Sequence, residues 1–339
     1  MGRTRREWIS FASAAGLSAA ALSSPATGAE QSAVRKRLPR EVWAASVSRD
    51  GIGAASSERL VQAVLGRMEQ IVPLRPDIIC TPETFAFTSV KGKLDQAAEK
   101  AGAGPVSRPF AEFARKHNCY VICCTYTKDE GRCYNSAIVF DRGGGVVGEY
   151  RKMHPTIDEM EDGVAPGPLD PPVFKTDFGT VGIQICFDIN WPDAWRKLRR
   201  AGAELVFWPS AYGGGTLLNA LAGENKFPIV SSTHKGTTKA CDITGEEIAS
   251  AGWVRPWLCV PLNLERAVVH AWPFCEHNAA IQAKYGDKIR IRILTENEWM
   301  IFESLSPEVR IAEVLKEFGI PTLEQYLMKS DAAQAARRA

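Results

Sequence analysis

The chain has 339 residues, of which 45% are hydrophobic and 24% are charged, and its formal net charge is +2. This is enough apolar material for a large buried core, and α/β folds of this size often form one domain. Because charges of both signs are mixed, without a basic stripe or an acidic tail, the composition argues against a nucleic-acid-binding role, and no nucleic acid is expected as a partner.

Residues 1–29 predict an export signal. Arginines precede a mildly apolar, alanine-rich run over residues 9–22, and small residues at 27–29 suit a cleavage site. The Arg5-Arg6 pair favours the twin-arginine route, although Glu7 is atypical there; a plain N-terminal tail is the alternative. The apolar run is shorter than the ~20 residues of a membrane helix. We therefore expect a bacterial protein exported to the periplasm or the medium, with no membrane attachment after leader removal, or a cytoplasmic one if the leader is not functional.

The nine cysteines do not form a recognisable framework. An odd count leaves at least one thiol unpaired, and no Cys or His pairs have the spacing of a zinc finger. Cys80, Cys123 and Cys124 lie inside apolar runs, where thiols pack as small hydrophobic groups. No metal is expected, and the disulfide content of an exported form stays open.

Strand and helix patterns alternate from residue 40 onward. Short apolar runs predict strands, and a 3.6-residue apolar period or a capping serine predicts helices. In the first half, the predicted strands span residues 42–48, 77–80, 120–126, 135–140 and 146–150, and the predicted helices span 56–72 and 107–117.

A long loop rich in proline, glycine and acidic residues is expected over residues 155–172, and loops of this length are often functional. Beyond it, strands are predicted at 181–186, 204–208, 229–233, 239–243, 247–251 and 267–271, and helices at 192–200, 216–225, 308–318 and 322–336. Interleaved strands and helices without a G-x-G-x-x-G opening predict an α/β fold and argue against a dinucleotide-binding one.

Three chemically suitable residues each follow or end a predicted strand. Cys186 ends the apolar strand at 181–186, Glu83 follows a second strand, and Lys152 follows a third. Each residue alone has an ordinary structural explanation, as a core cysteine or a solvated charge. Together they indicate a site, because strand ends of an open α/β sheet converge on one crevice.

This combination suits nucleophilic catalysis. A thiol with a reference pKa of ~8.5 is mostly protonated at neutral pH. A nearby carboxylate can take its proton during attack. A lysine ammonium stabilises the thiolate and the tetrahedral intermediate that follows.

The sequences around these residues resemble the signature blocks of the nitrilase superfamily of carbon–nitrogen hydrolases. They read PETF around Glu83, YRKMHPT around Lys152 and GIQICFDINWPDAWRKLRRAGAELVFWPSAY around Cys186, in the family's order. The resemblance covers roughly residues 40–303. It implies a four-layer αββα sandwich as a hydrolase domain over 40–303, followed by a C-terminal helical extension over 304–339.

The resemblance also implies roles for these residues. Glu83 would be the general base, Cys186 the nucleophile, and Lys152 the oxyanion stabiliser, joined by the backbone N–H of Phe187. The stretch from Lys152 to Glu159 resembles the K-x-x-P-T-x-x-E of nitrilases, so Glu159 is the candidate second glutamate. Glu161 and plain surface acidity are its alternatives.

Residues around the three blocks receive further assignments. The candidates for substrate binding are Phe187, Trp191 and Tyr212. His154 is interpreted as a structural polar residue, since the three blocks already supply a base. The pair Glu224-Asn225 resembles a supporting pair of the family, although the arginine common before it is missing.

The implied reaction is hydrolysis of a non-peptide carbon–nitrogen bond through a cysteine thioester, releasing ammonia or an amine without any metal or organic cofactor. Cys186-Phe187-Asp188 is closer to the C-x-D of amidases and carbamoylases than to the C-W-E of nitrilases, so the expected substrate is a small amide or N-carbamoyl amine. The P-T-x-x-E stretch favours the alternative, nitrile hydrolysis.

Other functional classes remain as alternatives. A catalytically silent family member would act as a binding protein, and an acyltransferase would replace water with an amine or alcohol. A disulfide-bonded secreted module is disfavoured by the long apolar core pattern and the odd cysteine count. Members of the family commonly pair their sandwiches, so we expect a homodimer or higher homo-oligomer.

Overall fold

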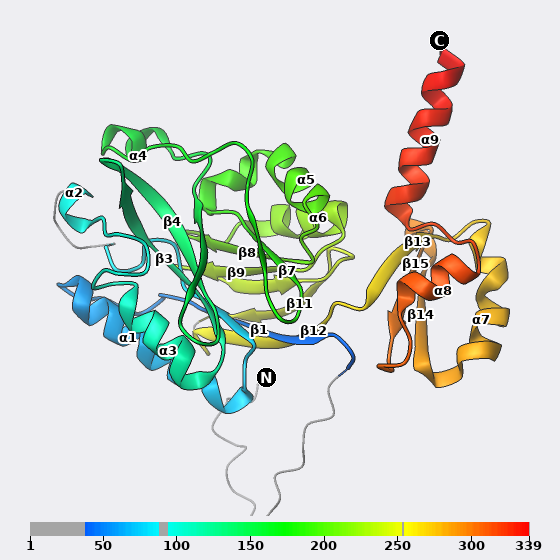
Figure 1. Ribbon diagram of the computed structural model, residues 1–339, viewed down its shortest axis with the longest axis horizontal. Helices are drawn as coiled ribbons and strands as arrows, with labels where there is room; N and C mark the ends of the chain where they lie inside the picture. The colour runs from blue at the N-terminus through cyan, green and yellow to red at the C-terminus, as the bar shows by residue number, and fades with distance from the viewer. Residues whose placement is uncertain (1–37, 88–93, 253, 339) are drawn as a thin grey trace, which may run out of the picture. The chain divides into compact units, whose positions relative to one another are not determined.

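The computed structural model describes residues 38–87, 94–252 and 254–338. Within these ranges, the strands form two six-stranded sheets and one three-stranded sheet (Figure 1). The predicted export signal at 1–29 lies outside the described residues. No helix in the described part of the chain has the length and apolar character needed to cross a bilayer.

The first sheet has the order β12-β1-β2-β3-β4-β5. Its strands are β1 (Glu41–Val47), β2 (Ile78–Cys80), β3 (Tyr120–Asp129), β4 (Arg132–Phe140), β5 (Val146–Arg151) and β12 (Trp257–Asn263). β1, β2 and β3 run parallel, and the remaining pairs are antiparallel. β2 is buried throughout, as its continuous apolar run predicts for a central parallel strand.

The second sheet has the order β11-β10-β9-β8-β7-β6. Its strands are β6 (Val173–Lys175), β7 (Thr180–Ile183), β8 (Leu205–Ser210), β9 (Ile229–Thr233), β10 (Thr238–Cys241) and β11 (Glu247–Ala251). β7, β8 and β9 are parallel at its centre. The parallel strands of each sheet, β1 to β3 and β7 to β9, are followed at their C-terminal ends by segments that carry polar residues.

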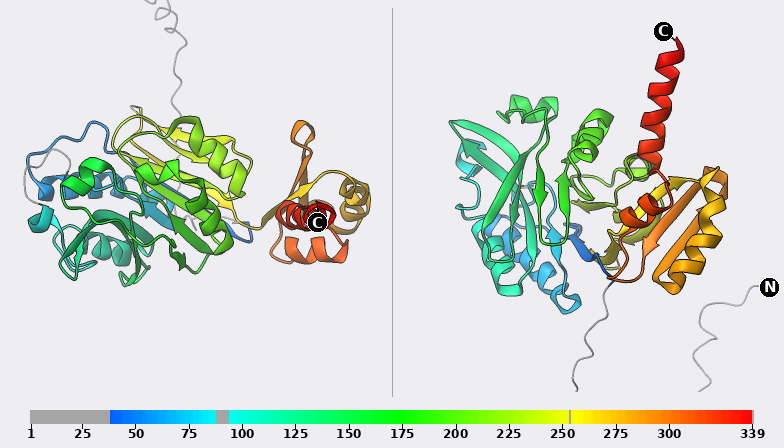
Figure 2. Two further views of the ribbon diagram at one scale, coloured as in Figure 1. Left: turned by 90° about the horizontal axis from the view of Figure 1, so that it is seen from above. Right: turned by 45° about the vertical axis from the view of Figure 1, so that its right-hand side comes forward.

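Helices cover the outer faces of the two sheets. α1 (Ser57–Glu69) and α3 (Arg108–His117) bury apolar side chains against the first sheet, and α5 (Pro192–Arg200) and α6 (Gly215–Asn225) against the second. The two helix pairs lie on opposite sides of the paired sheets (Figures 1 and 2). The expected αββα sandwich is therefore confirmed.

The loop expected over 155–172 contains a short helix, α4 (Ile157–Glu161), which the sequence analysis missed. Thr156 begins α4 with a capping box: its hydroxyl accepts from the Glu159 backbone N–H, and the Glu159 carboxylate accepts from the Thr156 backbone N–H. The signal was in the sequence, because T-x-x-E marks this type of helix start.

A third sheet follows the sandwich, in the order β13-β15-β14. It consists of β13 (Arg266–His270), β14 (Ile289–Leu294) and β15 (Trp299–Ser304), and α7 (Asn278–Tyr285), α8 (Ile311–Glu317) and α9 (Leu323–Arg338) accompany it (Figures 1 and 2). Its buried residues form a core of their own with α7 and α8. The division predicted between residues 303 and 304 falls at the last residues of β15. β14 and β15 were not predicted, although IRIRIL in β14 alternates with the period of a strand.

Candidate active site

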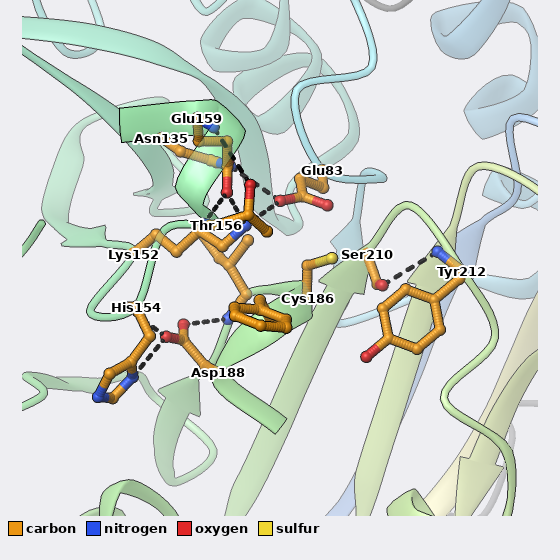
Figure 3. A network of polar contacts seen from close by, with 12 residues as sticks. Glu83, Asn135, Lys152, His154, Thr156, Glu159, Cys186, Asp188, Ser210 and Tyr212 are labelled. Atoms are coloured by element: carbon orange, nitrogen blue, oxygen red, sulfur yellow. Dashed lines mark hydrogen bonds and ion pairs between the residues drawn. The ribbon is translucent and has the colours of Figure 1, made fainter. Parts of the chain in front are cut away.

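The three residues expected to act together come from both sheets of the sandwich. Glu83 lies three residues beyond β2 and Lys152 directly follows β5, both in the first sheet. Cys186 lies three residues beyond β7 in the second sheet and begins a 3-10 turn over Cys186–Asn190. The convergence expected at the crevice of one open sheet is therefore produced by two stacked sheets, and Figure 3 shows the three side chains facing one another.

Lys152 lies between two carboxylates. Its side chain is 1% exposed, and Nζ donates to Glu83 Oε1 at 2.9 Å and to Glu159 Oε2 at 2.7 Å (Figure 3). Burial works to lower the pKa of Lys152, but the negative charges of Glu83 and Glu159 and the neighbouring Cys186 thiol raise it above its usual value. The ammonium therefore stays charged at neutral pH.

Asn135, on β4, was not identified from the sequence. Its side-chain Nδ2 donates to Glu83 Oε1 at 2.8 Å and to Glu159 Oε1 at 2.7 Å. One amide group thus holds both carboxylates around Lys152. The sequence did offer a signal for this residue: an asparagine in the middle of the stretch RCYNSAIVF, which ends in an apolar run.

Of the two candidate second glutamates, the structure brings Glu159 to the lysine and leaves Glu161 exposed. Burial works to raise the pKa of Glu159, but Lys152, the Thr156 backbone N–H and Asn135 together lower it. Glu159 is therefore ionised at neutral pH, and Lys152 is flanked by more negative charge than it can neutralise alone.

Cys186 occupies a strained position at the corner between β7 and the 3-10 turn. Its φ is +48°, in the left-handed region that residues other than glycine rarely adopt, and such strain is often found at functional sites. The Trp208 indole Nε1–H donates to the Cys186 carbonyl at 3.1 Å. The residue is 7% exposed.

The Cys186 thiol is protonated in this environment. Burial raises its pKa to about 12, the negative charge of Glu83 adds to the increase, and Lys152 opposes it. The Ser210 hydroxyl and the Ala211 backbone N–H also hydrogen-bond to the sulfur and favour the thiolate. Ser210, at the end of β8, was not identified from the sequence. A reaction at this sulfur therefore needs a base to remove the proton.

Asp188 organises the turn after Cys186. Its buried carboxylate accepts from Tyr150 Oη at 2.7 Å, from the Ile185 backbone N–H at 2.9 Å, and from His154 through the backbone N–H at 2.8 Å and Nδ1 at 3.0 Å. The His154 ring also stacks on Trp191, with centroids 4.0 Å apart. His154 thus contacts Asp188 and Trp191 rather than Glu83 or Lys152.

Three half-exposed aromatic residues lie around the nucleophile. Phe187, Trp191 and Tyr212 are 37%, 38% and 39% exposed. Phe187 meets Trp191 edge to face at 5.2 Å, and the Tyr212 backbone N–H donates to Ser210 Oγ at 3.1 Å. Burial raises the pKa of Tyr212, and Figure 3 shows its ring on the same side of the site as the Cys186 sulfur. These residues form an apolar rim.

A cavity of about 1500 Å³ adjoins the network on the Glu159 side. Its described lining includes Thr84, Tyr126 and Glu159 but not Cys186, so we do not assign it to the reacting centre. Among the described residues, all nine cysteines are free thiols, and no group of three or more His, Cys, Asp or Glu side chains is arranged to hold a metal ion.

The Glu224-Asn225 pair on α6 makes structural contacts. The buried Asn225 side chain donates to the Leu221 carbonyl at 2.8 Å, and the exposed Glu224 pairs with Arg196 at 2.6 Å. Neither residue contacts Cys186 through a hydrogen bond or an ion pair found in the described residues.

Residues 45–268 match the family model described as carbon-nitrogen hydrolase. The chain is 26% identical over 212 residues to a citrullinase of Francisella tularensis, covering 51% of this chain and 72% of that protein. It is 30% identical over 193 residues to a nitrilase of Pyrococcus abyssi, covering 57% and 69%. Other relatives are matched over only 37% to 66% of their own length.

The fold is similar to that of an amidase from a Nesterenkonia species, with a TM-score of 0.58 and 21% identity over 65% of this chain and 90% of that one. A structure of a mutant of that amidase shows covalent addition of the acetamide moiety of fluoroacetamide at the active site cysteine.

Proposed function

The chain belongs to the carbon–nitrogen hydrolase family, and from this membership we propose that it hydrolyses an amide or an N-carbamoyl amine through a thioester on Cys186. The observation that carries the proposal is the buried Lys152 ammonium, held between Glu83 and Glu159 near the protonated Cys186 thiol. A buried ion cluster of this kind is costly to fold, and catalytic sites are where such clusters gather.

In the first half of the reaction, Glu83 takes the Cys186 proton as the sulfur attacks the substrate carbonyl carbon. The carbonyl oxygen becomes an oxyanion, which Lys152 and the Phe187 backbone N–H stabilise. The carbon–nitrogen bond then breaks, and Glu83 returns the proton to the leaving nitrogen. Ammonia or an amine departs, and the acyl or carbamoyl group remains on sulfur.

In the second half, Glu83 takes a proton from a water molecule, whose oxygen attacks the thioester carbon. The second oxyanion is stabilised as before, the carbon–sulfur bond breaks, and the proton returns to the sulfur. The products are a carboxylic acid or a carbamic acid and the free thiol. Since burial and Glu83 keep the thiol protonated, the base acts within the attack step rather than on a preformed thiolate.

Glu159 would act differently from Glu83. Glu159 Oε2 accepts a hydrogen bond from Lys152 Nζ. The Thr156 backbone N–H and the Asn135 side chain donate to the same carboxylate and hold it in place. Fixed in this way, it orients the ammonium toward the developing oxyanion and keeps it charged. The rim of Phe187, Trp191 and Tyr212 would bind the apolar part of the substrate next to the sulfur.

The substrate class rests on the residues after the nucleophile. Cys186-Phe187-Asp188 carries the aspartate typical of amidases and carbamoylases, and Asp188 here is fully buried in a structural network. The relatives include a citrullinase and a nitrilase, so nitrile hydrolysis is the second candidate. For a nitrile, the sulfur would attack the nitrile carbon, and addition of two waters would release the acid and ammonia.

The test is an ammonia-release screen of the purified protein against simple amides, N-carbamoyl amines and nitriles. We expect turnover of an amide or carbamoyl compound, loss of turnover to background in Cys186→Ala, and a fall of about 10²- to 10⁴-fold in Glu83→Gln. Turnover of nitriles alone would move the assignment to the second candidate. Equal activity of wild type and Cys186→Ala would refute the mechanism.

A further inference from the structure

Two side chains, one on β9 and one directly after it, reach from the second sheet to the backbone of the first. Ser232 is fully buried, and its hydroxyl lies 2.7 Å from the Val47 carbonyl oxygen and 3.1 Å from the Cys80 carbonyl oxygen. His234 follows two residues later and contacts the Glu83 carbonyl oxygen through Nε2. These contacts show that both side chains point toward the first sheet and the segment that follows β2.

The backbone at Glu83 depends on such contacts. β2 ends at Cys80, so Glu83 lies three residues beyond the last ladder pair of its strand. Thr81 still donates its backbone N–H to the Ile122 carbonyl at 2.9 Å, and Thr84 turns the chain with a φ of +34°. Between Thr81 and Thr84, the Glu83 carbonyl is held by the side chain of His234, which follows β9 of the second sheet.

The same histidine is connected to the nucleophile. The His234 backbone N–H donates to the Ser210 carbonyl at 3.0 Å. The Ser210 hydroxyl hydrogen-bonds to the Cys186 sulfur, on which Glu83 also acts through its charge. A chain of contacts therefore runs from the thiol through Ser210 and His234 to the backbone carbonyl of Glu83, the residue proposed as its base.

We infer that His234 is a positioning residue, which fixes the distance between Glu83 and Cys186 by joining the two sheets at the catalytic edge. This inference rests on the proposed function. Glu83 must approach the thiol closely to take its proton, and a displacement of about 1 Å can cost 10²-fold in rate. For this role the imidazole needs to make only one hydrogen bond, from Nε2–H to the Glu83 carbonyl oxygen.

The surroundings favour the neutral ring that makes this bond. Burial lowers the pKa of His234, and the nearby charges of Arg49 and Lys235 lower it further, against the opposite effect of the Glu83 carbonyl and carboxylate. A neutral His234 therefore adds no positive charge beside Glu83 and acts on it through the backbone contact alone.

The experiment compares His234→Ala with His234→Gln, because the glutamine amide nitrogen reaches nearly the position of imidazole Nε2 and can still donate. Ser231→Ala is the matched control: Ser231 is a buried neighbour on β9 that bonds to Lys239 on the face away from the first sheet. For each variant we would measure kcat and KM with the active substrate, the rate of Cys186 alkylation by iodoacetamide with peptide mapping, and the thermal midpoint.

We expect His234→Ala to lower kcat about 10²-fold with little change in KM. We expect His234→Gln to recover at least tenfold of that loss, even where both variants unfold at the same temperature. Ser231→Ala should keep wild-type kcat. We expect alkylation of Cys186 to slow both in His234→Ala and in Glu83→Gln.

Two results would overturn the inference: wild-type kcat and alkylation in His234→Ala, or equal losses in the alanine and glutamine variants. A failure of the proposed function looks different, because Glu83→Gln would then alkylate as fast as wild type. The alkylation measurement needs no knowledge of the natural substrate, so the position of the base is tested even if the substrate screen finds none.

Discussion

At the scale of single residues, the site holds charged side chains that are shielded from water and stabilise one another instead. Glu83, Glu159 and Lys152 are largely buried, and removing such charges from water costs several kcal/mol each unless they are paired and hydrogen-bonded. Asn135 and the Thr156 backbone N–H provide those further hydrogen bonds. Each partner therefore depends on the others for its charge state.

This dependence predicts a pH-dependent contribution of Glu159 to stability. Its folded pKa lies below the ordinary value of 4.5, chiefly because Lys152 outweighs the effect of burial. A depressed carboxyl pKa stabilises the fold above the unfolded pKa, and this contribution is lost as pH falls through the folded value. We expect Glu159→Gln to lower the free energy of unfolding by about 1–3 kcal/mol at pH 7.

Urea unfolding of wild type and Glu159→Gln at pH 7 and at pH 3 measures this effect. The difference between the two proteins should shrink at the lower pH. The exposed Glu161→Gln serves as the control and should change the free energy of unfolding little at either pH. A Glu159→Gln effect of the same size at both pH values would contradict the charge pairing.

At the scale of secondary-structure elements, the short helix α4 determines where Glu159 points. Its five residues are too few for a helix to be stable alone, so the capping box at Thr156 matters more than in a long helix. The same contacts that begin the helix also direct the Glu159 carboxylate to Lys152.

Loss of this cap should therefore affect both stability and catalysis. We expect Thr156→Ala to lower the free energy of unfolding by about 0.5–2 kcal/mol, because the Glu159 backbone N–H loses its acceptor. Turnover should also fall, since Glu159 is less well held. Thr156→Ser retains the hydroxyl and should behave nearly as wild type in the same chemical denaturation and kinetic measurements. Equal behaviour of the alanine and serine variants would remove this role for the cap.

At the scale of the whole molecule, the candidate site depends on how the two sheets are stacked. The first sheet carries Glu83 and Lys152, and the second carries Cys186, so neither sheet holds the site alone. The third sheet has its own core and, apart from the first three residues of β13, lies outside the residues that match the family. The export signal and the oligomeric state stay predictions at this scale.

Sedimentation velocity at micromolar concentration tests the predicted assembly. Exposed apolar side chains such as Ile157 and Met160 on α4 and Leu327 and Met328 on α9 give two surfaces on which copies can pair. We expect a species at least twice the mass of one chain, which is 37.1 kDa before any cleavage. A species at or below that mass would refute the homo-oligomer.

The αββα fold could be predicted from the sequence because its information is local. Apolar periodicity marks each strand and helix, and the PETF, YRKMHPT and GIQICF blocks are short enough to recognise as a set. Two of the elements that were not predicted also have local signals: T-x-x-E before α4 and the alternation IRIRIL in β14.

The sequence alone determined which residues are proposed to carry the chemistry: an acid, an amine and a thiol, each at or just after a strand end. Only the tertiary structure decided their partners. Asn135 and His234 lie in no motif, and Ser210 and Asp188, although inside the block around Cys186, show their contacts across strands and sheets only in the folded chain. Hydrogen bonds and desolvation depend on distances in space, and the contact between His234 and Glu83 joins residues 151 positions apart in the chain. Such a distance leaves no period or spacing in the sequence, so only the folded chain defines it.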